Sequence, residues 1–134
     1  MLDLNVKNLA AVSEAGYEFE LLYPGLNEKT GAFVTVRGAD SKVIRAYSRK
    51  KFTEHQMRQK MDKRKGKDTD DFNIDVAEDT LIEATIERVI SWRGLGFDAV
   101  EVPFTKENAE RVFREHDWIR KQVMEESDNV LNFQ

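Results

Sequence analysis

Few residues of this 134-residue chain have the types and spacing that catalysis or metal binding needs. It contains no cysteine and two histidines, His55 and His116. Without cysteine there is no thiolate nucleophile or thiolate zinc site, and two histidines alone cannot form a multi-histidine metal site. His55 follows Glu54 directly, and adjacent residues of a helix do not face each other, so they form no base and orienting group. His116 lies between two predicted helices, where we expect it to cap or pack. We therefore predict no enzyme activity, no cofactor and no metal.

Acidic residues at alternate positions raise the question of a calcium site. A calcium loop needs Gly at its sixth position and Glu at its twelfth. In a loop that starts at Asp71, Asn73 and Asp75 fit, but Val76 is sixth and Ile82 twelfth. The chain also has no phosphate-binding glycine loop and no nucleophile-elbow motif. The sequence therefore predicts no calcium loop. The remaining candidate for a functional feature is the distribution of charged residues along the chain.

Charge is segregated along a chain that is acidic as a whole, with a formal net charge of −4 and a pI near 5.3. Residues 42–67 contain eleven Lys or Arg and two acids, whereas residues 68–79 contain six acids and no base. This pattern is typical either of a solvated helix face beside a polar linker or of an electrostatic docking surface. The docking hypothesis assigns self-association or partner binding to the basic residues Arg58, Lys60, Lys63, Arg64 and Lys65 and to the acidic residues Asp70 and Asp71.

Two kinds of partner would suit the basic stretch. If it meets the acidic stretch of another copy, the contact is head-to-tail, and such contacts build rings or open spirals. The alternative is a small nucleic-acid-binding regulator whose residues 42–67 neutralise phosphates. That stretch holds only two aromatic residues, Tyr47 and Phe52, and so lacks a series of rings on which bases could stack. We therefore expect a protein partner, a second copy included, rather than nucleic acid.

Two tryptophans complete the set of candidate partner-binding residues. Trp92 and Trp118 each lie at a predicted helix boundary. Tryptophan at such a position is usually a core or rim residue, but large aromatic side chains also dominate many interfaces. Both readings stay open for Trp92 and Trp118.

The N-terminal part that must position these residues has the period of strands. Apolar residues alternate with polar ones in residues 17–21, and residues 32–37 are β-branched and aromatic. These two runs predict an antiparallel hairpin. Residues 2–6 suggest a further short strand, and residues 8–14 are either one helical turn or a loop.

Helices are predicted after the hairpin. Asp40 and Ser41 are good N-caps for a long helix that continues to Gly66, with its first half on the sheet and its second half in solvent or on a partner. Asp75 then caps a helix with a broad apolar stripe that ends at Trp92, before Gly94 and Gly96. Residues 99–102 are expected to be extended. The first of the last two helices is capped by Thr105 and has Ala109, Val112 and Phe113 on its inner face. The second is capped by Asp117 and carries the apolar residues Ile119, Val123 and Met124.

The predicted fold class is therefore α+β and mostly helical, with a small N-terminal antiparallel hairpin or sheet. We expect a single domain, 1–134, made of a β-rich part (1–38), a basic helix (40–66), an acidic linker (67–75) and a cluster of short helices (76–134). No apolar run approaches the roughly 20 residues that span a bilayer, so we expect no membrane contact and a cytosolic protein.

The order of motifs in the C-terminal half resembles that of the tail assembly chaperones of long-tailed, siphovirus-type bacteriophages. A helical pattern ends in ISWRGL and is followed by EVPFTKENAERVFRE, then by WIRKQV and a closing Asn-Phe. The resemblance covers roughly residues 81–133, under half the chain. Its matching positions are Trp92, Gly94, Pro103, Thr105, Asn108, Ile119, Gln122, Val123, Asn132 and Phe133.

The resemblance implies a non-catalytic, mixed α/β and mostly helical protein. Members of that family bind the long helical tape measure protein and keep it soluble while tail tube subunits polymerise around it. They tend to form spirals, and they are absent from the finished virion. For this chain the resemblance implies a late protein of the host cytoplasm that binds itself and a tape measure protein. The family has no catalytic residues to transfer.

Overall fold

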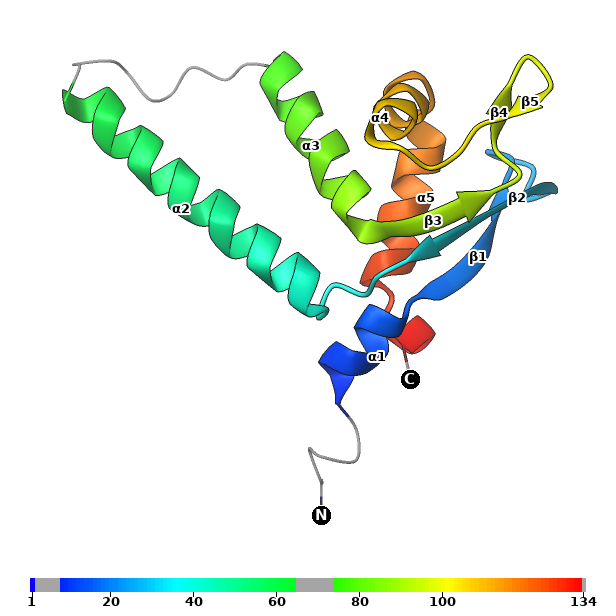
Figure 1. Ribbon diagram of the computed structural model, residues 1–134, viewed down its shortest axis with the longest axis horizontal. Helices are drawn as coiled ribbons and strands as arrows, with labels where there is room; N and C mark the ends of the chain where they lie inside the picture. The colour runs from blue at the N-terminus through cyan, green and yellow to red at the C-terminus, as the bar shows by residue number, and fades with distance from the viewer. Residues whose placement is uncertain (2–7, 65–73, 134) are drawn as a thin grey trace.

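The computed structural model describes residues 1, 8–64 and 74–133. They form an α+β fold that is mostly helical, as predicted (Figure 1). The predicted strand at residues 2–6 and nearly all of the predicted linker lie outside the described residues. In chain order the elements are α1 (Leu9–Ala15), β1 (Tyr17–Leu22), β2 (Lys29–Val36), α2 (Lys42–Arg64), α3 (Ile74–Arg88), β3 (Val89–Arg93), β4 (Gly96–Phe97), β5 (Val100–Glu101), α4 (Lys106–Glu115), α5 (Asp117–Asp128) and a 3-10 turn, η1 (Val130–Phe133).

The sheet has three antiparallel strands in the order β1-β2-β3. The predicted hairpin is confirmed, with Tyr17 opposite Val36 and Phe19 opposite Val34. Alternate residues of these strands are buried, as a half-covered sheet requires. Of the two possibilities for residues 8–14, the structure has the helix, whose N-cap Asn8 accepts a hydrogen bond from the Ala11 amide at 3.1 Å.

The predicted apolar helix is shorter than the sequence indicates, and this prediction was wrong at its C-terminal end. Helix α3 ends at Arg88, and Val89–Arg93 forms β3, with Trp92 opposite Val34 of β2. The β-branched pair at the start of this segment suits a strand, and β2 offers it an edge whose backbone groups need partners. Gly94 thus ends a strand. Its φ is +78°, and a Cβ there would lie 2.6 Å from the Gly31 carbonyl oxygen.

The core lies between the sheet and the helices α3, α4 and α5. The Thr105 side chain accepts the Asn108 amide at 3.2 Å, so the predicted cap of α4 is confirmed. The predicted cap of α5 shifts by one residue, because Asp117 is the first helical residue and His116 occupies the cap position without a side-chain cap bond. The predicted inner residues of α4, namely Ala109, Val112 and Phe113, are buried, as are Ile119 and Val123 of α5.

Helix α2 begins as predicted, with the Ser41 hydroxyl accepting the Ile44 amide at 3.2 Å. Its first half packs mainly against α1 and α3, whereas the sequence predicted packing on the sheet. Its second half extends away from the rest of the molecule, as predicted (Figure 1). The fold therefore presents one long helix beside a packed body.

Candidate functional site

The outer half of α2, whose described side chains run from Phe52 to Met61, exposes large apolar groups. Phe52 is 63% exposed, Met57 61% and Met61 52%. Met57 and Met61 are one helical turn apart and so lie on the same face. A helix in water gains most of its stability from a packed apolar face, and exposed apolar side chains gathered on one element mark interaction sites. This half of α2 has the character of a docking surface.

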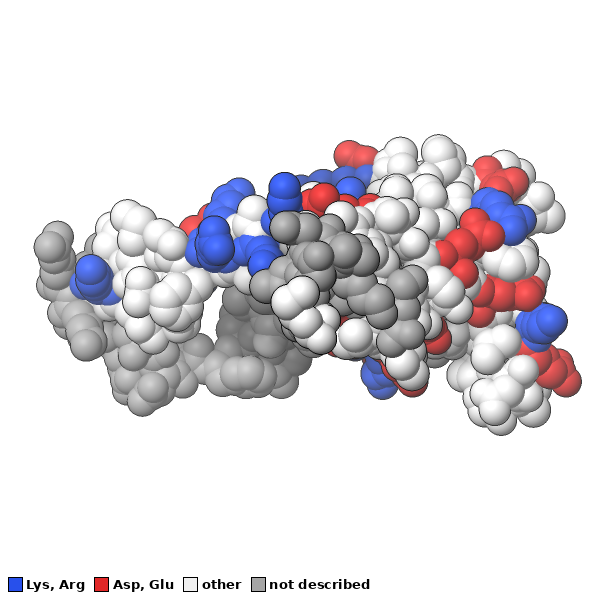
Figure 2. Space-filling view, turned by 90° about the horizontal axis from the view of Figure 1, so that it is seen from below, with Lys and Arg blue, Asp and Glu red and all other residues white. Residues whose placement is uncertain are grey.

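Basic side chains accompany these apolar ones. Figure 2 shows Lys and Arg along the α2 side of the molecule, at the left, and acidic side chains mostly toward the opposite end. Two bases of α2 are held within the chain: Arg45 pairs with Asp40 at 3.5 Å, and Lys51 with Glu83 of α3 at 2.8 Å. Five others are exposed and form no ion pair with a described residue, namely Lys42, Arg49, Lys50, Arg58 and Lys60.

The predicted charged residues are only partly within the described structure. Arg58 and Lys60 are exposed on α2, as the docking hypothesis requires. Lys63 and Arg64 lie in the last turn of α2, but their side chains fall outside the described part. Lys65, Asp70 and Asp71 lie outside it altogether.

The described end of the acidic stretch is bound within its own chain. Arg114 of α4 lies 2.8 Å from Asp79 and 3.9 Å from Glu78. Hydrogen bonding to Asp79 raises the pKa of Arg114 above its ordinary value. These two acids therefore hold α3 to α4, which restricts their use in an intermolecular contact.

The two tryptophans pack among residues of the body. The Trp92 indole Nε1 donates to the Val102 carbonyl at 2.9 Å, and its ring lies edge-on to Phe104 at 5.0 Å and Phe113 at 6.4 Å. Trp118 is half-buried with its ring 6.4 Å from that of Tyr23. The structure does not bring them together with the bases of α2, and it favours the core or rim reading for Trp92.

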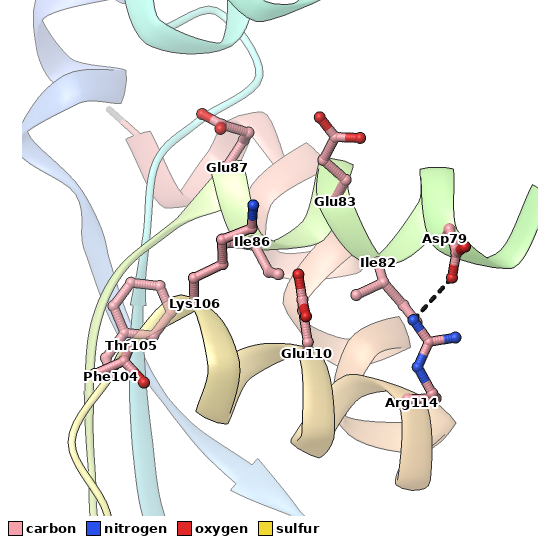
Figure 3. Close-up of a pocket in the computed structure, with 10 residues that line it drawn as sticks. All are labelled: Asp79, Ile82, Glu83, Ile86, Glu87, Phe104, Thr105, Lys106, Glu110 and Arg114. Atoms are coloured by element: carbon pink, nitrogen blue, oxygen red, sulfur yellow. Dashed lines mark hydrogen bonds and ion pairs between the residues drawn. The ribbon is translucent and has the colours of Figure 1, made fainter. Parts of the chain in front are cut away.

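A groove between α3 and α4 is a feature that the sequence analysis missed (Figure 3). It has a volume of about 600 Å³. Three residues give it an apolar floor, and its rim carries four carboxylates against two cations. The only sequence signal for it is the spacing of Glu83 and Glu87, one turn apart on the helix that also carries the apolar stripe. The floor consists of Ile82, Ile86 and Phe104, the rim of Asp79, Glu83, Glu87, Glu110, Lys106 and Arg114, and Thr105 completes the lining.

The contact between α2 and α3 lies beside this groove. Lys51 reaches Glu83 on its rim, and hydrogen bonding to that carboxylate raises the pKa of Lys51. The Tyr47 hydroxyl is buried here without a hydrogen-bond partner among the described residues. Burial, and then the nearby charge of Glu83, raise the pKa of Tyr47 above its ordinary value of 10.0. The Lys51–Glu83 pair thus shows that a basic side chain of α2 can approach the acidic rim of the groove.

The residues that carry the family resemblance serve the fold. The Gln122 side chain accepts the Leu22 amide at 3.0 Å and donates to the Leu22 carbonyl at 2.8 Å, which joins α5 to β1. Asn108 donates to the Pro103 carbonyl at 2.9 Å and fixes the approach to α4. These residues explain the C-terminal architecture and do not by themselves form a binding site.

Within the described ranges, no three His, Asp or Glu side chains gather in an arrangement that could hold a metal ion. None of the helices there combines the length and apolar character that crossing a bilayer requires.

Residues 38–134 match the model of the YdaY prophage protein family. The match includes α2, the groove and the whole C-terminal half, which is well over half of the chain. No curated protein and no solved structure matches the chain.

Proposed function

The chain belongs to the YdaY prophage protein family and is therefore of phage origin, and we propose that it is a tail assembly chaperone. In this role it has no enzyme activity, self-associates, and binds the tape measure protein in the host cytoplasm while the tail tube assembles. It does not enter the mature virion. The observation that carries the proposal is the outer half of α2, which exposes apolar and basic side chains together.

The chemistry of α2 suits a client that must be held but not modified. Met57 and Met61 are flexible, and methionine-rich surfaces adapt to partners of varied shape. The bases around them attract acidic surface at long range and speed the encounter. Contact of this kind keeps an aggregation-prone helical protein covered and still allows its release.

Self-association multiplies this surface. A long client needs many copies of one binding surface along its length, and head-to-tail contacts between identical chains supply them. Such an array gains affinity by multivalency, even when each copy binds weakly. Because the surface is charged and exposed, we expect salt to weaken the assembly.

Co-expression with the tape measure protein of the same phage genome tests the proposal. We expect the two proteins to co-purify and the tape measure protein to become more soluble. Met57→Gln with Met61→Gln should reduce both effects. The matched control is Val130→Gln with Leu131→Gln, because these side chains are also 54% and 73% exposed but lie outside α2. A tape measure protein that is equally insoluble with and without this chain would contradict the proposal.

A second candidate is the nucleic-acid-binding regulator, favoured by the five exposed bases of α2 that have no ion pair in the described structure. Binding through them predicts gel shifts whose affinity falls steeply with salt. It also predicts that Lys50→Glu with Lys60→Glu reduces both the affinity and the salt slope. Absence of a shift at low salt would exclude this candidate.

A further inference from the structure

The groove between α3 and α4 contains two carboxylates that are available to a partner. Asp79 is paired with Arg114, and Glu83 with Lys51. Glu87 and Glu110 form no ion pair with a described residue, although they flank the same apolar floor. Figure 3 shows Lys106 extending across the groove toward Ile86 and Glu87. The groove thus combines two half-buried carboxylates, Glu87 and Glu110, with apolar surface.

The exposed face of α2 between Lys50 and Met61, which we call the arm, has the complementary chemistry. Lys50 and Met57 are seven residues apart, and Lys60 and Met61 follow Met57 by three and four residues, so all four lie within one side of the helix. All four side chains are exposed. This face carries two cations and two flexible apolar groups beside one acid, Glu54, which pairs with Lys51 at 3.4 Å. The groove carries the opposite balance, with four carboxylates and two cations around an apolar floor.

From this complementarity we infer that the arm of one copy docks into the α3/α4 groove of a second copy. Met57 and Met61 cover the floor formed by Ile82, Ile86 and Phe104, and the lysines of the arm approach Glu87 and Glu110. The inference rests on the self-association in the proposed function and names its two surfaces.

The chain's own α2 does not occupy its own groove in this way. Its first half contacts α3 through Lys51 and Glu83, and its second half diverges from α3 (Figure 1). Among the residues that the structure describes, nothing but Lys51 of α2 reaches the groove from this helix, so a copy keeps both an arm and a groove for a partner. Since the two surfaces differ, the contact is heterologous and adds copies in one direction, as a spiral or ring requires.

Disulfide trapping tests this contact, because the chain has no cysteine of its own. Two single variants of the full chain, Met57→Cys on the arm and Lys106→Cys at the groove, are mixed and mildly oxidised. We expect a mixed covalent dimer that high salt suppresses. The matched control replaces Lys106→Cys by Lys121→Cys, an exposed lysine of α5 outside the groove. Equal yields of mixed dimer with the two lysine positions would overturn the inference.

Charge exchange gives a second, independent readout. Glu87→Lys with Glu110→Lys makes the groove basic, and Lys50→Glu with Lys60→Glu makes the arm acidic. Each variant alone should associate about tenfold more weakly, and a mixture of the two should recover, because each arm again meets a groove of opposite charge. Failure of the mixture to recover, with both variants folded by circular dichroism, would also overturn the inference.

The two proposals fail separately. Specific trapping without any effect on the tape measure protein would leave the arm-in-groove contact and remove the chaperone function. Solubilisation of the client by the groove variant that no longer self-associates would support the chaperone function and show that it does not depend on the contact.

Discussion

Helix α5 and the outer half of α2 are both rich in polar residues, but α5 packs into the body whereas the outer half of α2 is exposed. Helix α5 buries Ile119, Val123 and Ser127, and its Gln122 bonds to the backbone of β1. The outer half of α2 buries none of its described side chains between Phe52 and Met61. One helix is part of the architecture, whereas the other is a surface.

The residues that stabilise the fold and the residues that have binding chemistry thus lie in different parts of the chain. The residues that resemble the tail chaperone family lie in the packed region and account for its capping, hydrogen bonds and core. The residues with binding chemistry lie in α2 and around the α3/α4 groove, where the fold makes little use of them. Mutations of the packed residues should change stability, and mutations of these binding residues should change association.

Trp92→Ala should have the largest effect on stability. It removes ring contacts with Phe104 and Phe113 and the hydrogen bond to Val102, so we expect the free energy of unfolding to fall by about 3 kcal/mol. Denaturant unfolding measures this. Trp92→Phe keeps most of the packing and should lose about 1 kcal/mol. A fully stable Trp92→Ala variant would instead make this ring a binding residue.

Gln122→Ala should come next. It leaves the amide and carbonyl of Leu22 without their side-chain partner in a half-buried place, which costs about 2 kcal/mol. Thermal unfolding should show the loss. Lys121→Ala on the same helix is the control, because that side chain is exposed and should change stability by less than about 0.5 kcal/mol. Equal stability of the two variants would show that α5 is not held to β1 in this way.

Tyr47→Phe should raise the free energy of unfolding by about 1 kcal/mol, because it removes a buried hydroxyl that has no partner among the described residues. The raised pKa of Tyr47 also predicts a pH dependence. As the pH rises above 10.0, the unfolded chain releases this proton before the folded one does, so stability present below that pH is lost. The variant should lose less stability than the parent between neutral and strongly alkaline pH. A destabilised variant would mean that the hydroxyl has a partner.

Met57→Gln with Met61→Gln should have the smallest effect on folding, within about 0.5 kcal/mol, because both side chains are already exposed. Urea unfolding of dilute protein measures this. A loss of more than about 2 kcal/mol would show that these residues pack within the chain, and the comparison between the two helices would collapse.

Local signals were enough to predict the hairpin, the long helix and the caps at Ser41 and Thr105, because period and capping chemistry act over a few residues. They could not predict β3. Val89 and Ile90 continue the helical stripe of α3 without a break, and only the free edge of β2 turns them into a strand. Tertiary pairing therefore overrides the local period at this point.

The candidate site, too, could be predicted from the sequence only in part. The basic character of α2 follows from composition, and Arg58 and Lys60 are exposed as expected. The groove could not be predicted, because it joins Glu87 of α3 to Glu110 of α4 through the packing of two helices. Nor could the capture of Asp79 by Arg114, which lies 35 residues away in the chain.

Sedimentation velocity over a wide range of protein concentration at low salt tests most directly whether α2 is an association surface. Wild-type chain is compared with Lys50→Glu/Lys60→Glu and with Lys29→Glu/Lys121→Glu, which changes the net charge equally at exposed lysines outside α2. We predict that the wild type and the control grow in mass with concentration, whereas the α2 variant needs about tenfold more protein to reach the same mass. A wild type that remains monomeric throughout, or an α2 variant that associates as strongly as the control, would contradict it.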